Sequence, residues 1–215
     1  MKAHGVLHRF LLGLTALAFA GAALAQQPLR QKLEYDLISP QPVSTGERIE
    51  VIEFFWYGCP HCYNLQPPLD AWLKRKPADV ELRRIPAVFR DSWIPHARVY
   101  YTLEALNEVG RLHHAVYRSI HVDKYSLMTA EAAAAWASRN GIEPARWNAV
   151  YTSPEIERNI QESKKHTIAY AIEGTPSLVV DGRYLTSSGK AESMPQVITI
   201  LDGLIVMARE KRLAR

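Results

Sequence analysis

The chain has 215 residues, of which 26 are Lys or Arg, 22 are Asp or Glu and two are Cys. Once Lys2 and Arg9 are set aside, basic and acidic residues nearly balance, which excludes a dedicated binder of nucleic acid or of anionic membranes. A chain of this length can bury a core of its own, so the two cysteines are not needed to staple the fold.

Residues 1–25 predict a secretory signal peptide. Lys2 and Arg9 give the start of the chain a positive charge, and residues 10–23 form an apolar run. Ala23 and Ala25 then supply the small side chains that a signal peptidase recognises. The apolar run is too short to span a bilayer, which takes roughly 20 residues. We expect the mature protein to begin near Gln26 and to act outside the cytoplasm; an N-terminal anchor helix is the alternative.

The next part of the chain predicts strands around a single helix. A short strand is predicted over residues 34–38. Residues 49–56 (IEVIEFFW) form an almost continuous apolar, β-prone run, which is typical of a strand buried on both faces. Cys59 and Cys62 follow directly, then apolar residues at helical spacing over residues 62–76, and a second strand over residues 80–89.

Residues 95–171 predict helices only. The candidates are residues 97–109, 111–120 and 130–139, the last with Thr129 as its N-cap, and a longer helix after the cap Ser153. The chain therefore carries a helical block between its two groups of strands.

Strand signals return after this block. Residues 177–180 predict a strand, and Asp181-Gly182 predicts a tight hairpin turn into residues 183–186. Ser193 begins a capping box for the last helix, which we expect to end near residue 207. The order of elements predicts an α/β fold with an inserted helical block.

The two cysteines stand three positions apart, in the stretch Cys59-Pro60-His61-Cys62, and three interpretations compete. A structural disulfide closing so short a loop stabilises a fold by only about 2 kcal/mol, less than one between distant cysteines. A closed zinc site needs four ligands, and these cysteines supply two. The histidines of the helical block show no paired ligand spacing: His96, His113, His114, His121 and His166.

A redox pair is the interpretation that the context favours. A strand, then Cys-x-x-Cys, then a helix places Cys59 at the helix N-terminus, with Cys62 one turn inside. The free backbone amides and the helix dipole at that end stabilise a thiolate, and His61 can add positive charge or a hydrogen bond. A stabilised thiolate favours the dithiol form, so the disulfide becomes a stronger oxidant.

Three stretches together resemble the DsbA family of periplasmic thiol:disulfide oxidases, over essentially the whole mature chain: Phe54-Phe55, Cys59-Pro60-His61-Cys62-Tyr63 and Gly174-Thr175-Pro176-Ser177. Gly58, where some relatives carry an aromatic residue, is a minor departure. The resemblance implies a thioredoxin-like fold with an inserted all-helical domain. Residues 26–90 and 172–215 would form the thioredoxin-like domain, and residues 91–171 the helical insertion.

The resemblance also implies roles for individual residues. Cys59 would be the exposed nucleophile and Cys62 the buried resolving thiol, with Pro60-His61 typical of oxidases. The Thr175–Pro176 bond would be cis and face the disulfide, with the Thr175 backbone pairing to an extended substrate.

Glu53 would be a buried acid that accepts or relays the proton of the resolving cysteine. Arg84 stands where the family usually has a lysine partner for this acid, and an arginine does not release a proton at ordinary pH, which puts a shared relay in doubt. Trp56 and Tyr57 are either core residues or a rim for apolar substrate segments.

We therefore predict an enzyme that donates the Cys59–Cys62 disulfide to newly exported proteins in the periplasm. The resemblance implies a membrane quinone reductase of the DsbB type as reoxidant, and we expect no cofactor beyond the disulfide, no metal, no nucleic-acid partner and a monomer. The alternatives are a disulfide isomerase or reductase of the same superfamily, and a non-enzymatic periplasmic chaperone.

Overall fold

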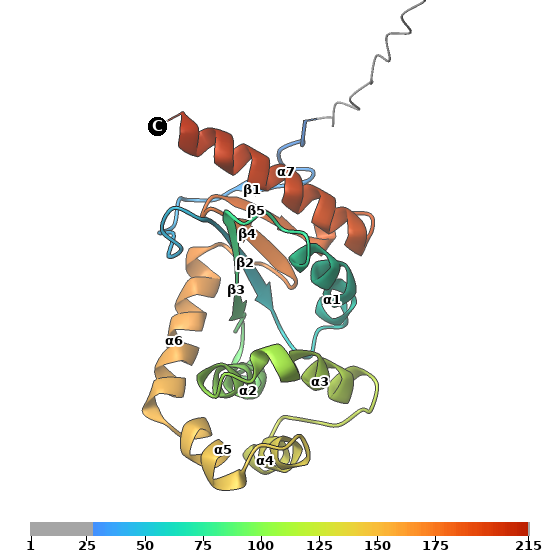
Figure 1. The fold of residues 1–215 in the computed structure, drawn as a ribbon, viewed down its shortest axis with the longest axis vertical. Helices are drawn as coiled ribbons and strands as arrows, with labels where there is room; N and C mark the ends of the chain where they lie inside the picture. The colour runs from blue at the N-terminus through green and yellow to red at the C-terminus, as the bar shows by residue number, and fades with distance from the viewer. Residues whose placement is uncertain (1–27, 215) are drawn as a thin grey trace, which may run out of the picture.

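A five-stranded sheet lies at the centre of the described part of the chain, residues 28–214, in this computed structural model (Figure 1). The strand order is β1-β5-β4-β2-β3. The bounds are β1 Asp36–Leu37, β2 Ile49–Phe55, β3 Val80–Pro86, β4 Ser177–Val180 and β5 Tyr184–Ser187. The predicted signal peptide lies outside the described residues.

The interior strand β2, which lies between β4 and β3, is buried along its whole length, as its apolar sequence predicts. It pairs with β3 in parallel and with β4 antiparallel, and β5 and β1 extend the sheet in antiparallel fashion. The parallel register sets Glu53 opposite Arg84. The predicted second strand ends at Pro86, three residues before Phe89, because the chain leaves the sheet there toward the helices.

Helices cover both faces of the sheet. α1 (Pro60–Leu73) and α7 (Met194–Leu213) pack on the face that carries Val51, through Leu65, Leu69, Leu201 and Leu204. Ile52 and Phe54 point to the opposite face, where they pack against Tyr170 and Ile172 just after α6 (Pro154–Ala169). Figure 1 shows α1 and α7 on one side of the sheet and α6 on the other.

The predicted helical insertion lies between β3 and β4 in sequence; its helices before α6 lie beyond one end of the sheet, and α6 runs back along one side of it (Figure 1). A short 3-10 turn (Asp91–Trp93) leads into α2 (Ile94–Ala105), α3 (Val109–His121), α4 (Ala130–Arg139), α5 (Pro144–Tyr151) and α6. The buried residues of these helices form one cluster that also contains Phe55, Tyr57, Cys59 and Cys62. The cysteine motif therefore belongs to the boundary between the sheet and the helices.

The caps and the turn follow the sequence signals. Thr129, Ser153 and Ser193 each accept a hydrogen bond from a backbone amide of the helix that they precede. Asp181 and Gly182 both have positive φ, 53° and 62°, as a tight hairpin turn of type I′ requires.

α2, α5 and α7 differ most from the sequence expectation. α2 spans Ile94–Ala105 rather than residues 97–109. α5 has only eight residues, too few for a clear apolar period, although Glu143 caps it through two backbone amides. α7 continues to Leu213 rather than ending near residue 207, because Arg209 and Arg212 on its last turns bind Asp79 and Asp181.

Candidate active site

The cysteine motif lies between the end of β2 and the start of α1. Cys59 is the N-cap of this helix, with extended φ and ψ of −87° and 118°, and Pro60 occupies the first helical position, where a missing amide costs nothing. Cys62 lies in the first turn. The predicted placement of Cys59 at the helix N-terminus, with Cys62 one turn inside, is confirmed.

The two sulfur atoms differ in their access to solvent. Both cysteines are free thiols in this structure. Cys62 is completely buried, and Cys59 is 8% exposed, so the expected exposed nucleophile is in fact largely covered. The cover comes in part from the loop before β4, because Cys59 Sγ lies 3.3 Å from the carbonyl oxygen of Thr175, to which its thiol donates. Cys59 is nevertheless the only sulfur of the pair with any exposure.

The surroundings favour ionisation of one thiol over the other. A hydrogen bond from Cys62 is the largest cause that lowers the pKa of Cys59, to about 5. Burial opposes this effect, and a hydrogen bond with Thr175 and the backbone groups of Cys62 and His61 add to it. Burial raises the pKa of Cys62 well above its usual value. His61 itself is exposed, and its contribution to the Cys59 pKa comes through its backbone.

The reduced protein is expected to gain stability over the oxidised protein as pH rises. Between pH 5 and pH 9 the folded protein holds Cys59 as a thiolate while the unfolded chain keeps it protonated. The unfolded state then binds one more proton, so the free energy of unfolding rises by up to about 1.4 kcal/mol per pH unit. Cys62 adds no slope in this range, because it is protonated in both states.

Denaturant unfolding of the reduced and oxidised forms at pH 5, 7 and 9 measures this difference. The gain should be complete above pH 9 and lost as the pH falls through 5. Parallel stability curves for the two forms would show that Cys59 ionises like an ordinary thiol.

Glu53 is a fully buried carboxylate beneath this motif. Its Oε2 accepts a hydrogen bond from Arg84 Nε at 2.8 Å, so Arg84 does pair with it. Burial is the largest single influence and lowers the pKa of Arg84, but Glu53, with smaller contributions from Tyr100 and Tyr57, raises it overall. Its Oε1 accepts a hydrogen bond from Gln66 Nε2 at 3.0 Å. Gln66 is not among the site residues predicted from the sequence, although it lies four residues after Cys62 and therefore on the same face of α1.

The loop before β4 meets the motif from the other side. The Thr175–Pro176 peptide bond is cis, as the resemblance implies. A cavity of about 470 Å³ lies beside these two residues, between β1, β5 and the turn that ends at Lys190. The structure thus brings together Cys59, Cys62, Thr175 and Pro176, with Glu53 behind them.

The aromatic residues before the cysteines have different environments. Tyr57 is a core residue, fully buried, with its hydroxyl 2.9 Å from His113 Nδ1. Trp56 is half-buried and stacks on Trp93, with ring centroids 4.2 Å apart. Its indole also lies against Gly58, where any side chain would clash with the ring. The absence of a side chain at Gly58 therefore leaves room for the Trp56 indole.

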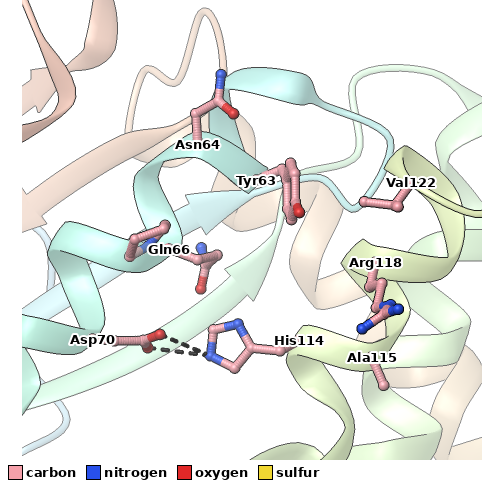
Figure 2. Close-up of a pocket in the computed structure, with 9 residues that line it drawn as sticks. Tyr63, Asn64, Gln66, Asp70, His114, Ala115, Arg118 and Val122 are labelled. Atoms are coloured by element: carbon pink, nitrogen blue, oxygen red, sulfur yellow. Dashed lines mark hydrogen bonds and ion pairs between the residues drawn. The ribbon is translucent and has the colours of Figure 1, made fainter.

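A larger cavity, of about 840 Å³, lies between α1 and α3 (Figure 2). Asp70 on α1 and His114 on α3 are joined across it, with His114 Nε2 3.0 Å from the Asp70 carboxylate. Tyr63, Gln66 and Arg118 also line it. Within residues 28–214 no three His, Cys, Asp or Glu residues are placed to hold a metal ion, and no helix is long and apolar enough to cross a membrane.

Known proteins resemble this chain in sequence over most of its length. The chain is 34% identical over 209 residues to a thiol:disulfide interchange protein DsbA of Burkholderia cepacia, covering 97% of this chain and 99% of the relative. It is 36% identical over 191 residues to the DsbA of Pseudomonas aeruginosa, covering 89% of this chain and 90% of the relative.

Solved structures and a family model agree with these relatives. A crystal structure of Pseudomonas aeruginosa DsbA superposes with a TM-score of 0.82 at 34% identity, covering 86% of this chain and 96% of that one. The Xylella fastidiosa oxidoreductase DsbA gives a TM-score of 0.76 at 30% identity, covering 82% and 96%. The model of the DSBA-like thioredoxin domain matches residues 95–199. This range does not include Cys59 and Cys62, which lie in the part of the chain before it. The chain belongs to the DsbA family of thioredoxin-fold proteins.

Proposed function

We propose that this thiol:disulfide oxidoreductase oxidises cysteine pairs of newly exported proteins in the periplasm with its Cys59–Cys62 disulfide. The observation that carries the proposal is the asymmetry of the two thiols at the start of α1. The pKa of Cys59 is lowered to about 5, whereas that of Cys62 is raised. The relatives named thiol:disulfide interchange proteins support the same activity.

The reaction follows from this asymmetry in two displacements. A substrate thiolate attacks Cys59 Sγ, the partly exposed sulfur, which forms a mixed disulfide and releases Cys62 as a thiolate that takes up a proton. A second substrate thiolate then attacks the substrate sulfur of the mixed disulfide. Cys59 leaves readily because it is stable as a thiolate, and the two electrons of the substrate dithiol end on the enzyme.

The surrounding residues have supporting roles in this proposal. Thr175 and Pro176 hold an extended substrate segment across the sulfur, a role supported by the 3.3 Å contact between Cys59 Sγ and the Thr175 carbonyl. Pro60 occupies the first position of α1, and the backbone of His61 helps to lower the pKa of Cys59. Glu53 exchanges the proton of Cys62. Arg84 fixes the position of this acid without releasing a proton of its own.

The enzyme ends each turnover reduced and needs an electron acceptor. We propose a membrane quinone reductase of the DsbB type in this role, with no cofactor beyond the cysteine pair. We further propose a monomer made of a thioredoxin-like domain, residues 26–90 and 172–215, and a helical insertion, residues 91–171. Most of the buried residues of the helices pack in one cluster, distinct from the cluster under α1 and α7, which supports this division, and the end of β2 and the cysteine motif join the helical cluster at the boundary.

Two measurements test the proposed function. The oxidised protein should restore activity to a reduced, unfolded disulfide protein at stoichiometric amounts. The reduction potential of the cysteine pair, measured against glutathione, should lie well above the about −270 mV of thioredoxin. A value near thioredoxin's, together with better reduction than oxidation of substrates, would instead assign the protein as a reductase.

A further inference from the structure

Gln66 is a buried polar residue without an evident structural reason. It is 1% exposed and lies in α1, one turn after Cys62. Its Nε2 donates to Glu53 Oε1 at 3.0 Å and to the Cys62 carbonyl at 3.2 Å. Its Oε1 is buried and has no hydrogen-bond partner within residues 28–214. The side-chain amide thus donates to both Glu53 and the Cys62 carbonyl, while its own oxygen accepts no hydrogen bond from the described residues.

The two oxygens of Glu53 have different neighbours. Oε2 accepts from Arg84, which stays charged and keeps that oxygen as an acceptor. A proton that reaches Glu53 therefore belongs on Oε1, the oxygen that faces Gln66. An acid O–H at this position needs an acceptor, whereas the carboxylate needs a donor.

The remaining groups around Glu53 do not meet this need. The titratable neighbours are Tyr57 after β2 and Tyr117 on α3, and burial raises the pKa of each far enough to keep it neutral. β4 places Leu178 opposite Glu53, which offers no polar side chain. A neutral tyrosine hydroxyl can donate and accept, but the Tyr57 hydroxyl pairs with His113 and neither tyrosine is hydrogen-bonded to Glu53, whereas Gln66 is.

We propose that Gln66 is a positioning residue that holds Glu53 in both of its protonation states, with the amide nitrogen toward the carboxylate and the amide oxygen toward the acid. The change between the two is a half-turn of the terminal amide, which also breaks the hydrogen bond from Gln66 Nε2 to the Cys62 carbonyl. The inference rests on the proposed role of Glu53 in exchanging the proton of Cys62.

The proton is accounted for at each step. When the enzyme is reoxidised, the S–H bond of Cys62 breaks and an O–H bond forms on Glu53 Oε1, while Gln66 turns its oxygen to accept from it. Glu53 then releases the proton to water, and Gln66 returns to the donor arrangement seen here. In the oxidation of a substrate the same transfer runs backward. Gln66 borders the cavity between α1 and α3, which brings water close to this group (Figure 2).

The test is the Gln66→Leu variant, which removes donor and acceptor and keeps a side chain of similar size. The rate of exchange between the oxidised enzyme and a small dithiol, measured from pH 5 to 9, should fall by about tenfold at neutral pH. The pH–rate profile should also move to higher pH, because the carboxylate loses a donor. The ultraviolet thiolate titration of Cys59 should not change, since Gln66 does not contact that sulfur.

A matched control is Gln161→Leu on α6. Like Gln66, Gln161 donates a hydrogen bond to a glutamate. Its partner is Glu157, one turn earlier on the same helix, at 2.9 Å, and this pair is exposed. Its removal should leave both rate and pH profile as in the unmodified protein. If Gln66→Leu behaves like this control, with rates within about twofold at every pH, the proposal is wrong.

Two further variants separate the possible failures. If Gln66→Leu does not fold, Gln66→Glu should fold and add a second step to the pH–rate profile, because two carboxyl groups sharing one site titrate apart; an unchanged profile would overturn the proposal. Glu53→Gln should itself alter the profile, and adding Gln66→Leu to it should slow exchange no further. A normal profile for Glu53→Gln would reject the proton role of Glu53 rather than the role of Gln66 alone.

Discussion

Replacing Cys59 with serine should reduce the oxidation of a substrate dithiol by at least about a thousandfold, because no mixed disulfide can form at this position. Serine is nearly isosteric with cysteine, and a hydroxyl can also donate the hydrogen bond that the Cys59 thiol makes to the Thr175 carbonyl. The fold should therefore survive the change. Activity is measured as the rate at which a reduced, unfolded substrate regains its disulfides.

The Cys62→Ser variant is the informative companion. It keeps the sulfur at position 59, at the start of α1, but lacks the buried thiol that we propose resolves a mixed disulfide. We expect it to form long-lived mixed disulfides with substrates, detectable on non-reducing gels, whereas Cys59→Ser forms none. Equal trapping by both variants, or full activity of Cys59→Ser, would contradict the assignment of Cys59 as the nucleophile.

The Arg84→Leu variant should lower the free energy of unfolding by about 3–5 kcal/mol, because it leaves the buried Glu53 carboxylate without its cation. Glu53 is completely buried, and Arg84 supplies a hydrogen bond of 2.8 Å as well as a charge. Leucine replaces neither. Denaturant unfolding at pH 7 measures the loss.

Arg75 gives a matched control for this substitution. Arg75 and Asp202 also lie 2.8 Å apart, but their side chains are 57% and 35% exposed, so Arg75→Leu should cost no more than about 1 kcal/mol. Adding Glu53→Leu to Arg84→Leu should recover much of the loss, since the unpaired charge is then gone. Similar costs for Arg84→Leu and Arg75→Leu would mean that the buried pair contributes no more than an exposed one.

The active-site motif was readable because its chemistry is local. The run IEVIEFFW predicts the buried strand β2, and Cys59 to Cys62 follow it so closely that the start of α1 is fixed within one turn. Caps such as Thr129 and Ser153 bind backbone amides three positions away, so they too can be predicted from the local sequence. The resemblance added the cis bond at Thr175–Pro176, which spacing alone does not reveal.

The environment of the motif, in contrast, depended on the tertiary structure. The pairing of Glu53 with Arg84 requires the register of two strands whose paired residues are 31 positions apart, and the contact of Cys59 with Thr175 spans 116 positions. Gln66 reads as an ordinary polar residue of α1 until the helix packs on the sheet and turns it toward Glu53. The sequence by itself determined where the cysteine pair lies at the start of α1, because periodicity and capping are set by near neighbours. Only the folded chain decided how covered Cys59 is and which groups hold the buried acid, because those properties arise where distant segments exclude water from one another.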